Sequence, residues 1–344
     1  MDPVDIRALT RALVDIDSTS GRESEAGVWL AAWLRERKWS VTEQAVSEGR
    51  FNIIATLSGP ARVVLSTHYD CVPPFFPSRE SDGRIVGRGS CDAKGILAAQ
   101  VAAAEALRAS GETAIGLLFV VGEERGSDGA RTANTTPLDG VAFLINGEPT
   151  DNRLGIATRG ALRIRLDATG RAAHSAYPHL GESAIDKLLE ALAIIKRLEL
   201  PVDPDMGPTH YITALISGGV APNVIPASAS AELLFRTVGD NIEIRRLLGK
   251  VEHLVNVEEV LSLPVARMHV PSGFESVAFP YTTDVSALTN WGTPLLLGPG
   301  SIQVAHTDEE SVAVAELEAA VDLYVRLART LQSSRSLGTQ GRRT

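Results

Sequence analysis

Apolar residues recur at helical spacing in three segments of the first half of the chain. Residues 6–16 carry an amphipathic pattern, and residues 25–39 continue it after Ser20 and Glu23, which have the spacing of a capping box at a helix start. The alanine-rich stretch at 92–110 is the third such segment. Together they predict three helices before the middle of the chain.

Short apolar runs alternate with these helices. Residues 62–67, 114–121 and 141–146 are almost continuously apolar over the length of a strand. Runs of this kind are typical of strands that are buried on both faces of a sheet. The alternation of helices with buried strands indicates an α/β fold with a mainly parallel sheet.

The pattern changes near Thr158. Residues 160–170 alternate apolar and polar side chains, as in an antiparallel strand with one solvated face, and a mixture of helices and strands follows. A chain of 344 residues is also long for one core. The predicted organisation is an α/β domain of residues 1–157 and 268–332, an α+β domain inserted at 158–267, and a polar, disordered tail at 333–344.

The chain is acidic, with a formal net charge of -9 and a pI of about 5.4. This charge disfavours binding to nucleic acids or to anionic membranes, and no apolar stretch is long enough to span a membrane. The first residues lack the basic and apolar segments of a signal peptide. Cys71 and Cys91 are the only cysteines, so we expect no disulfide framework and predict a cytoplasmic protein.

Histidines and carboxylates follow the predicted buried strands. In open parallel sheets, ligands bind outside the carboxyl ends of the strands. The candidate residues near this edge are His68, Asp70, Asp92, Glu123, Glu124, Glu148 and His306. So many carboxylates would repel one another and resist desolvation unless cations were bound among them.

This residue set suits a pair of metal ions. Histidine and carboxylate ligands favour zinc, and two metals roughly 3.5–4 Å apart need one bridging carboxylate. We assign the bridge to Asp92. One metal then takes His68, Asp92 and Glu148, and the other takes Asp92, Glu124 and His306. The prediction is two Zn²⁺ per chain, with Co²⁺ or Mn²⁺ as alternatives.

Glu123 and Asp70 hold no metal in this assignment. Neighbouring residues at a strand end point to opposite sides, so Glu124 can bind metal while Glu123 acts as general base for the metal-bridged water. Asp70 lies two residues after His68, where it can accept the other imidazole N–H. Taken singly, each motif also fits a structural role, such as a helix cap for Asp92. The convergence of all of them at one edge favours the metal site.

Several motifs resemble those of the co-catalytic zinc deacylase and exopeptidase family, which includes acetylornithine deacetylase, succinyl-diaminopimelate desuccinylase, aminoacylase and glutamate carboxypeptidases. The motifs are STHYDCVP, GRGSCDAKG, GEERGSDGA, GEPT and GPGSIQVAHTDEE. The resemblance implies a zinc exopeptidase-like catalytic domain, and it implies that the inserted domain is the lid and dimerisation domain of a homodimer. Relatives often carry a cis peptide bond after the bridging residue, so we expect one between Asp92 and Ala93.

The resemblance also implies roles for residues outside the metal set. GRAAHSAYPHLGESAI resembles the family motif whose histidine reaches an active site, usually that of the partner subunit. His174 is therefore expected to hydrogen-bond the oxyanion. Asn223 and Arg236 match positions that contact substrate, with Arg236 clamping a carboxylate. Asp284 matches a position in the substrate loop.

By resemblance, the reaction is hydrolysis of the amide bond of an N-acyl amino acid, as in acetylornithine deacetylase. The partner would be a small N-acyl amino acid or a short peptide. The first alternative is a dipeptidase or carboxypeptidase with the same machinery. The second is a metal-binding dimer without catalysis, which the presence of Glu123 disfavours.

Two features bear on the substrate. Asp308, Glu309 and Glu310 follow the last predicted ligand, and this extra acid favours a basic product, as in the lysine- and ornithine-releasing deacylases of amino-acid biosynthesis. The alternative is a helix start with acidic residues, which is common. Phe75 and Phe76 are candidates for the acyl side of the site, by family analogy.

Overall fold

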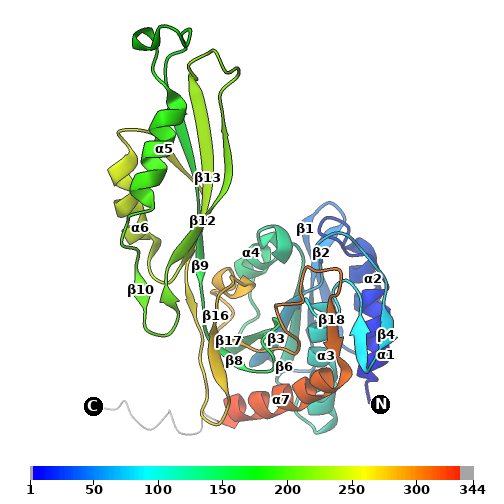
Figure 1. Ribbon diagram of the computed structural model, residues 1–344. Coiled ribbons are helices and arrows are strands. Elements are labelled where there is room, and N and C mark those ends of the chain that lie inside the picture. The colour runs from blue at the N-terminus through cyan, green and yellow to red at the C-terminus, as the bar shows by residue number, and fades with distance from the viewer. Residues whose placement is uncertain (1–2, 334–344) are drawn as a thin grey trace, which may run out of the picture. The chain divides into compact units, whose positions relative to one another are not determined.

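The structure is a computed structural model that describes residues 3–333 (Figure 1). The chain divides into two compact units. The first contains the residues up to Ile156, Arg267–Val277 and those from Thr283 onward, and the second contains Ala157–Ala266 and Ala278–Thr282. The predicted boundaries placed residues 278–282 in the first domain, whereas their contacts are with the second unit. The predicted tail lies outside the described residues, apart from Ser333, which ends a helix.

A six-stranded sheet forms the centre of the first unit. Its strands in spatial order are β1 (Ser40–Ser47), β2 (Arg50–Thr56), β6 (Ile115–Val120), β3 (Val63–His68), β7 (Phe143–Asn146) and β17 (Thr293–Leu296). The strands from β6 to β17 are parallel, and β1 and β2 join them as an antiparallel hairpin at one edge. The prediction of a mainly parallel sheet in an α/β domain is therefore confirmed.

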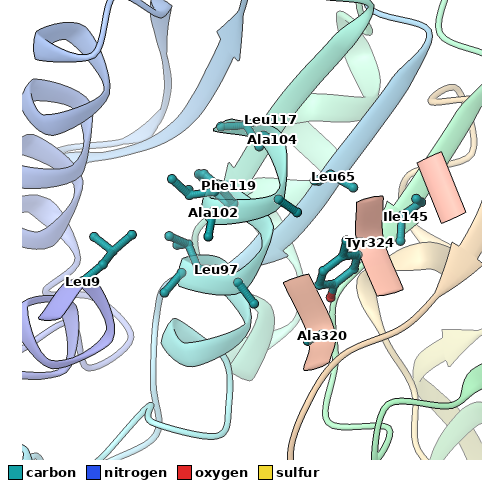
Figure 2. Close-up of a cluster of buried hydrophobic side chains, with 14 of the residues drawn as sticks. Leu9, Leu65, Leu97, Ala102, Ala104, Leu117, Phe119, Ile145, Ala320 and Tyr324 are labelled. Atoms are coloured by element: carbon teal, nitrogen blue, oxygen red, sulfur yellow. The ribbon is translucent and has the colours of Figure 1, made fainter. Parts of the chain in front are cut away.

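Helices cover both faces of this sheet. One face packs against α1 (Ile6–Val14), α2 (Ser24–Glu36), α3 (Lys94–Ala109) and α7 (Val314–Ser333), and the other packs against α4 (Asp128–Thr135). Because successive strand residues point to opposite faces, Leu65 and Phe119 join the first core, shown in Figure 2, while Val64 and Leu118 join the second. This two-sided burial explains the continuous apolar runs in the sequence.

The predicted capping box at Ser20 and Glu23 is wrong. Helix α2 begins at Ser24, and the Glu23 side chain makes no cap hydrogen bond. Glu23 instead pairs with Arg50 at 2.9 Å, and the Ser20 hydroxyl donates to Asp70 at 2.7 Å. These side chains are buried, and leaving a buried charge unpaired costs more than leaving one helix N–H uncapped.

Smaller elements complete the first unit. A three-stranded sheet contains β4 (Arg79–Ser81), β5 (Arg84–Val86) and β18 (Ser311–Ala313). Another three-stranded sheet contains β8 (Leu154–Thr158), β15 (Ala266–Arg267) and β16 (Ser276–Phe279), and the residues of these strands are divided between the two units. Single 3-10 turns lie at η1 (Glu123–Arg125) and η4 (Asp284–Ser286). Within residues 3–333, no helix has the length and apolar character needed to cross a membrane.

The second unit has a four-stranded antiparallel sheet. Its strands in spatial order are β12 (His210–Gly218), β13 (Ser228–Thr237), β9 (Gly160–Thr169) and β14 (Asn256–Leu263). Helices α5 (Ala184–Ile195) and α6 (Asn241–Leu248) bury one face, and two-residue strands β10 (Val202–Asp203) and β11 (Gly207–Pro208) pair beside the sheet. The alternation at 160–170 correctly predicted the antiparallel strand β9.

Candidate functional site

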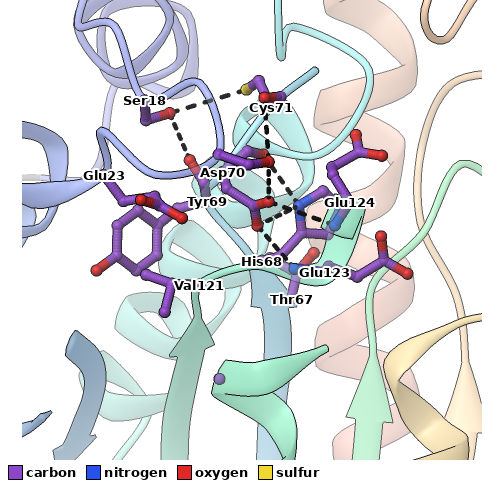
Figure 3. A network of polar contacts seen from close by, with 12 residues as sticks. Ser18, Glu23, Thr67, His68, Tyr69, Asp70, Cys71, Val121, Glu123 and Glu124 are labelled. Atoms are coloured by element: carbon purple, nitrogen blue, oxygen red, sulfur yellow. Dashed lines mark hydrogen bonds and ion pairs between the residues drawn. The ribbon is translucent and has the colours of Figure 1, made fainter. Parts of the chain in front are cut away.

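The predicted site residues of the first unit follow three adjacent parallel strands. His68 is the last residue of β3, Glu123 follows the end of β6 through Gly122, and Glu148 follows the end of β7. Because β3 lies between β6 and β7, these loops leave the sheet at the same edge. Figure 3 shows His68, Asp70, Glu123 and Glu124 gathered there.

Asp92 lies between two imidazoles. Its Oδ1 is 3.1 Å from Nε2 of His68, and its Oδ2 is 3.4 Å from Nε2 of His306. Nε2 of His306 also lies 2.9 Å from Oε1 of Glu124. The donor atoms of His68, Asp92 and Glu124 lie within 4.8 Å of one another. Each carboxylate oxygen of Asp92 thus faces a different histidine, as a bridging ligand requires. The Asp92–Ala93 peptide bond is cis, as predicted.

Asp70 orients both His68 and the loop after β6. Nδ1 of His68 lies 3.0 Å from the Asp70 carbonyl oxygen and 3.4 Å from its Oδ1, so Nδ1 donates and Nε2 is left to bind a metal. The Asp70 carboxylate accepts the backbone N–H groups of Glu123 and Glu124 at 3.1 and 3.3 Å. Burial alone would raise the pKa of Asp70, but the hydrogen bonds from His68, Ser20 and Glu123 hold it below its usual value.

Their position in the sequence predicted that Glu123 and Glu124 lie at the end of a strand. In the structure they lie outside the strand. They form the one-turn helix η1, which begins after Gly122 in the left-handed region at φ 74°. A side chain at Gly122 would have its Cβ 1.9 Å from an oxygen of Asp128, so only glycine fits this turn. The two carboxylates still take different directions, because Glu124 reaches His306 whereas Glu123 makes no such contact.

Asp92 and Glu148 are buried, Glu123 and Glu124 are half-buried, and the four carboxylates lie close enough together to affect one another's pKa values. Burial raises the pKa of Glu148 well above its usual value, and the neighbouring charges of Glu123 and Asp92 raise it further. Oε1 of Glu148 is buried and has no hydrogen-bond partner. Burial likewise raises the pKa of Glu123. A buried oxygen without a hydrogen bond, close to histidines that face carboxylates, is suited to a divalent cation. Such a cation would compensate the negative charge of the carboxylates and bind the free oxygen.

Asp284 belongs to the same acidic cluster. Residue Thr283 caps the turn η4, and the Asp284 side chain that follows is only 1% exposed. Neither of its oxygens makes a hydrogen bond of normal geometry. Burial raises the pKa of Asp284 to about 6, against the opposing influence of Ser127 and His68. Its charge in turn raises the pKa of Glu123, so the two carboxylates interact.

His174, Asn223 and Arg236 lie in the second unit. Nδ1 of His174 accepts the backbone N–H of Ala176 at 3.1 Å, so the neutral ring carries its proton on Nε2 and can donate it. His174 forms an isolated bridge with Val224, and Asn223 accepts a hydrogen bond from Ser175 at its carbonyl. Both side chains are exposed.

Arg236 is half-buried on β13. It donates to the Thr282 hydroxyl at 3.4 Å, and within residues 3–333 it has no carboxylate partner. Burial lowers the pKa of its guanidinium. A half-buried guanidinium without a counterion is suited to bind a carboxylate.

The expectation that three acids near His306 face the substrate is wrong for Glu310. Its carboxylate is fully buried and pairs with Arg88 at 2.6 Å, whereas Asp308 and Glu309 are exposed. The Arg88 guanidinium also covers the ring of Phe76, at 4.9 Å from its centroid. Phe76 therefore packs in the protein, and of the two phenylalanines only Phe75 is an exposed residue.

Sequence reasoning missed the charged residues that support the site. Arg50 joins Glu23 and Asp128 at 2.9 and 2.5 Å and so ties α2 to the helix that follows the Glu123 loop. The spacing of residues in the sequence does not predict these three contacting residues, because they are far apart in the chain. The available signal was the charge of Arg50 at the start of β2, a strand whose middle is buried.

The chain resembles known proteins over nearly its whole length. Residues 64–330 match the family model described as Peptidase family M20/M25/M40. The chain is 38% identical over 364 residues to a protein of Aspergillus terreus named "Probable carboxypeptidase", and the match covers 92% of this chain and 84% of the relative.

Solved structures share the fold. A tripeptidase from Staphylococcus aureus superposes with a TM-score of 0.80 at 21% identity, covering 95% of this chain and 98% of that one. A dinuclear metal binding peptidase of the M20 family from Bacillus subtilis superposes with a TM-score of 0.69 at 15% identity, covering 94% and 98%. The two-unit architecture is thus that of known peptidases.

Proposed function

This chain belongs to peptidase family M20/M25/M40, and from that premise we propose that it hydrolyses the amide bond of an amino acid with a free α-carboxylate, as a carboxypeptidase or dipeptidase. The observation that carries the proposal is Asp92 between two imidazoles, with Glu123 close enough to His68 and Asp92 for their charges to shift its pKa. The Arg236 guanidinium has no carboxylate partner within residues 3–333, which supports recognition of the substrate carboxylate. The similarity to a relative named as a probable carboxypeptidase favours a peptide on the acyl side.

A second candidate is deacylation of an N-acyl amino acid, of the acetylornithine deacetylase type. The motif GPGSIQVAHTDEE favours it, because it resembles the deacetylase ending that supplies the last histidine. The preference for a basic product loses part of its support, since Glu310 is buried in an ion pair. Both candidates use the same bond chemistry and differ in the acyl group.

We assign the metal ligands as follows: His68, Asp92 and Glu148 for one ion, and Asp92, Glu124 and His306 for the other. Zinc fits these donors, with cobalt or manganese as alternatives. When bound, such ions polarise the scissile carbonyl and make water a stronger acid.

The residues of the chain supply the remaining steps of the proposed reaction. Glu123 takes the proton of the attacking water and passes it to the leaving amine. The Nε2–H of His174 donates to the oxyanion, and Arg236 clamps the substrate carboxylate. Asn223 and Asp284 contact the substrate. Asp70 holds the His68 ring and the backbone of Glu123 in place.

A substrate panel tests the proposal. Purified protein loaded with zinc, cobalt or manganese would be given dipeptides and N-blocked dipeptides, the same peptides with C-terminal amides, N-acetylornithine and acetylated neutral amino acids. Released amine would be measured by ninhydrin and mass spectrometry. We expect turnover of peptides with a free carboxylate and little turnover of the amides.

Each outcome of the panel is decisive. Faster turnover of N-acetylornithine than of any peptide would favour the deacylase. Equal turnover of the amides would contradict recognition of the carboxylate. No amine from any compound, in a protein that binds two metals, would contradict the proposed activity.

We also propose that the second unit is the lid and dimerisation domain of a homodimer. In the described part of the chain, its edge strand β12 pairs on one side only. This strand carries Ile212, Leu215 and Ile216, which are 59%, 60% and 61% exposed, and Val220 beyond it is 86% exposed. An exposed apolar edge strand readily pairs with another strand. A cytoplasmic location stays a prediction.

Replacing Leu215 by glutamate is expected to convert the dimer to a monomer, because a charge would be buried where two β12 strands meet. The measurement is molar mass by light scattering on a sizing column. Val260→Glu on the opposite edge strand β14, where Val260 is 43% exposed, is the matched control and should stay dimeric. A monomeric wild-type protein would contradict the dimer, and a dimeric Leu215→Glu variant would place the interface elsewhere.

A further inference from the structure

The carboxylate of Glu310 collects four hydrogen bonds in the interior of the first unit. Its Oε2 accepts from Nη1 of Arg88 at 2.6 Å. Its Oε1 accepts from the backbone N–H groups of Gly89, Cys91 and Asp92 at 2.9, 3.2 and 3.0 Å. The side chain is completely buried. Glu310 therefore binds the backbone of Asp92, the residue that faces both imidazoles.

The loop at 87–92 is shaped around this carboxylate. Three N–H groups converge on one oxygen, and such a concave set of donors is an anion-binding arrangement that a carboxylate satisfies more strongly than a neutral side chain. The carbonyl oxygen of Glu310 accepts from the Gly87 N–H at 3.0 Å and from the Ser90 hydroxyl at 3.3 Å. Strand β18 begins at the next residue and pairs with β5, which precedes the loop. The Glu310 segment and the Asp92 loop are thus one assembly.

Arg88 extends this assembly to the loop after β3. Its Nε donates to the Pro74 carbonyl at 3.1 Å, and its guanidinium covers Phe76. Arg88 is 1% exposed, so its charge must be compensated inside the protein, and Glu310 is its ion-pair partner. The buried pair therefore links the segments that follow His68, carry Asp92 and follow His306.

His306 needs such support. It is a non-glycine residue in the left-handed region, at φ 65°, which side chains with a Cβ adopt rarely and only when their surroundings hold them there. The ring is half-exposed and contacts Asp92 and Glu124. Residues 307–309 are exposed, and Glu310 is the first residue after His306 that is completely buried.

We propose that Glu310 is a positioning residue that sets Asp92 and His306 at the separation required to bind metal, with Arg88 as its counterion. This inference rests on the proposed function, because it concerns the same metal site. It assigns to Glu310 a role in metal affinity and turnover that is separate from the contribution of a buried ion pair to stability. Outer-shell partners of metal ligands typically alter metal affinity or activity by roughly 10–100-fold.

The test is Glu310→Gln, which keeps the size of the side chain but turns one oxygen into a donor that faces Arg88 or the backbone N–H groups. Glu309→Gln is the matched control, because it removes the same charge from the neighbouring exposed residue. The measurements are zinc affinity by competition with a chelator, metal content per chain, kcat, KM and Tm. We expect about 10–100-fold weaker zinc binding and lower kcat for Glu310→Gln, KM within roughly threefold, and partial recovery of kcat in excess zinc. Glu309→Gln should match the wild type.

Several results would overturn the inference. A lower Tm with unchanged zinc affinity would mean that Glu310 acts only on stability, and an equal effect of Glu309→Gln would mean that net charge is responsible. If Glu310→Gln does not fold, Arg88→Lys takes its place, since it keeps the three backbone hydrogen bonds of Glu310 and should weaken zinc binding less. Unchanged zinc affinity in that variant would likewise contradict the role of the pair. Zinc affinity is measured without substrate, so it judges this inference even if the protein hydrolyses none of the panel.

Discussion

Glu123→Gln is expected to lower kcat by about 10²–10⁴-fold while both metals stay bound, which is the range for loss of a general base. The change keeps the size of the side chain and removes only its ability to take a proton. In the structure, His306 contacts Glu124 and not Glu123 through its Nε2, and burial raises the pKa of the Glu123 carboxyl group well above the usual value. A raised pKa makes the carboxylate a stronger base than an exposed glutamate.

The neighbouring residue supplies the matched control for this experiment. Glu124→Gln is the same chemical change one residue later, and it should lose metal as well as activity, because Glu124 contacts His306 at 2.9 Å. Metal content by mass spectrometry and kcat on the best substrate of the panel separate the two variants. Metal loss in Glu123→Gln would make Glu123 a ligand, and full activity in that variant would remove it from the reaction.

Chelation of the metals is expected to abolish turnover, and zinc added back should restore it. Ligands that bind only the folded protein also stabilise it, by about 2.7 kcal/mol at 100 times their Kd, so Tm should fall in the chelated protein. The physical reason lies in the carboxylates that burial holds together at the site, among them Glu148 with its unpaired oxygen. Turnover that survives exhaustive chelation would contradict a metal-dependent hydrolase.

The uptake of metal should release protons. Hydrogen bonds to Asp92 and Glu124 raise the pKa of His306 from 6.5 to about 10, so the metal-free protein holds a proton on this ring at neutral pH. The stabilisation from that protonated ring is complete below about 6.5 and is lost as the pH rises through about 10. A metal needs the neutral imidazole, so its apparent affinity should increase as the pH rises from 7 toward 10.

Calorimetric titration with zinc in two buffers of different ionisation enthalpy measures this release. The apparent enthalpies should differ in proportion to the protons released per chain. His306→Ala serves as the control, because it removes the raised group and should reduce the difference. Identical enthalpies in both buffers would show that His306 is already neutral when the metal arrives.

The sequence predicted much of the first unit because its signals are local. Continuous apolar runs at 62–67, 114–121 and 141–146 mark strands that are covered on both faces, and such strands form a parallel sheet in an α/β chain. The rule that ligands gather at the carboxyl ends of these strands then placed His68 and Glu148 at one edge. Their approach in the structure follows from the adjacency of β3 and β7.

Local signals failed where a side chain had a distant partner. Ser20 and Glu23 have the spacing of a capping box, but Glu23 pairs with Arg50 and Ser20 with Asp70. Glu310 looked like a free acid beside His306, although it is buried. In each case, burial of a charge or hydroxyl requires a hydrogen-bond or ion-pair partner inside the protein. The identity of that partner cannot be predicted from the local sequence.

The sequence by itself determined the family resemblance, the parallel core and the kinds of residue available for metal and proton chemistry, because periodicity, residue type and motif order are all written along the chain. The sequence also assigned Asp92 as the bridge and Glu124 to the metal of His306, but only the tertiary structure supplies the contacts: each oxygen of Asp92 faces a different imidazole, and Glu124 reaches His306. The closing of the Asp92 loop on Glu310 was decided by the tertiary structure alone. Those facts depend on distances between residues that lie from 24 to 218 positions apart in the chain. They are set by packing and by the pairing of buried charges, and no local pattern carries that information.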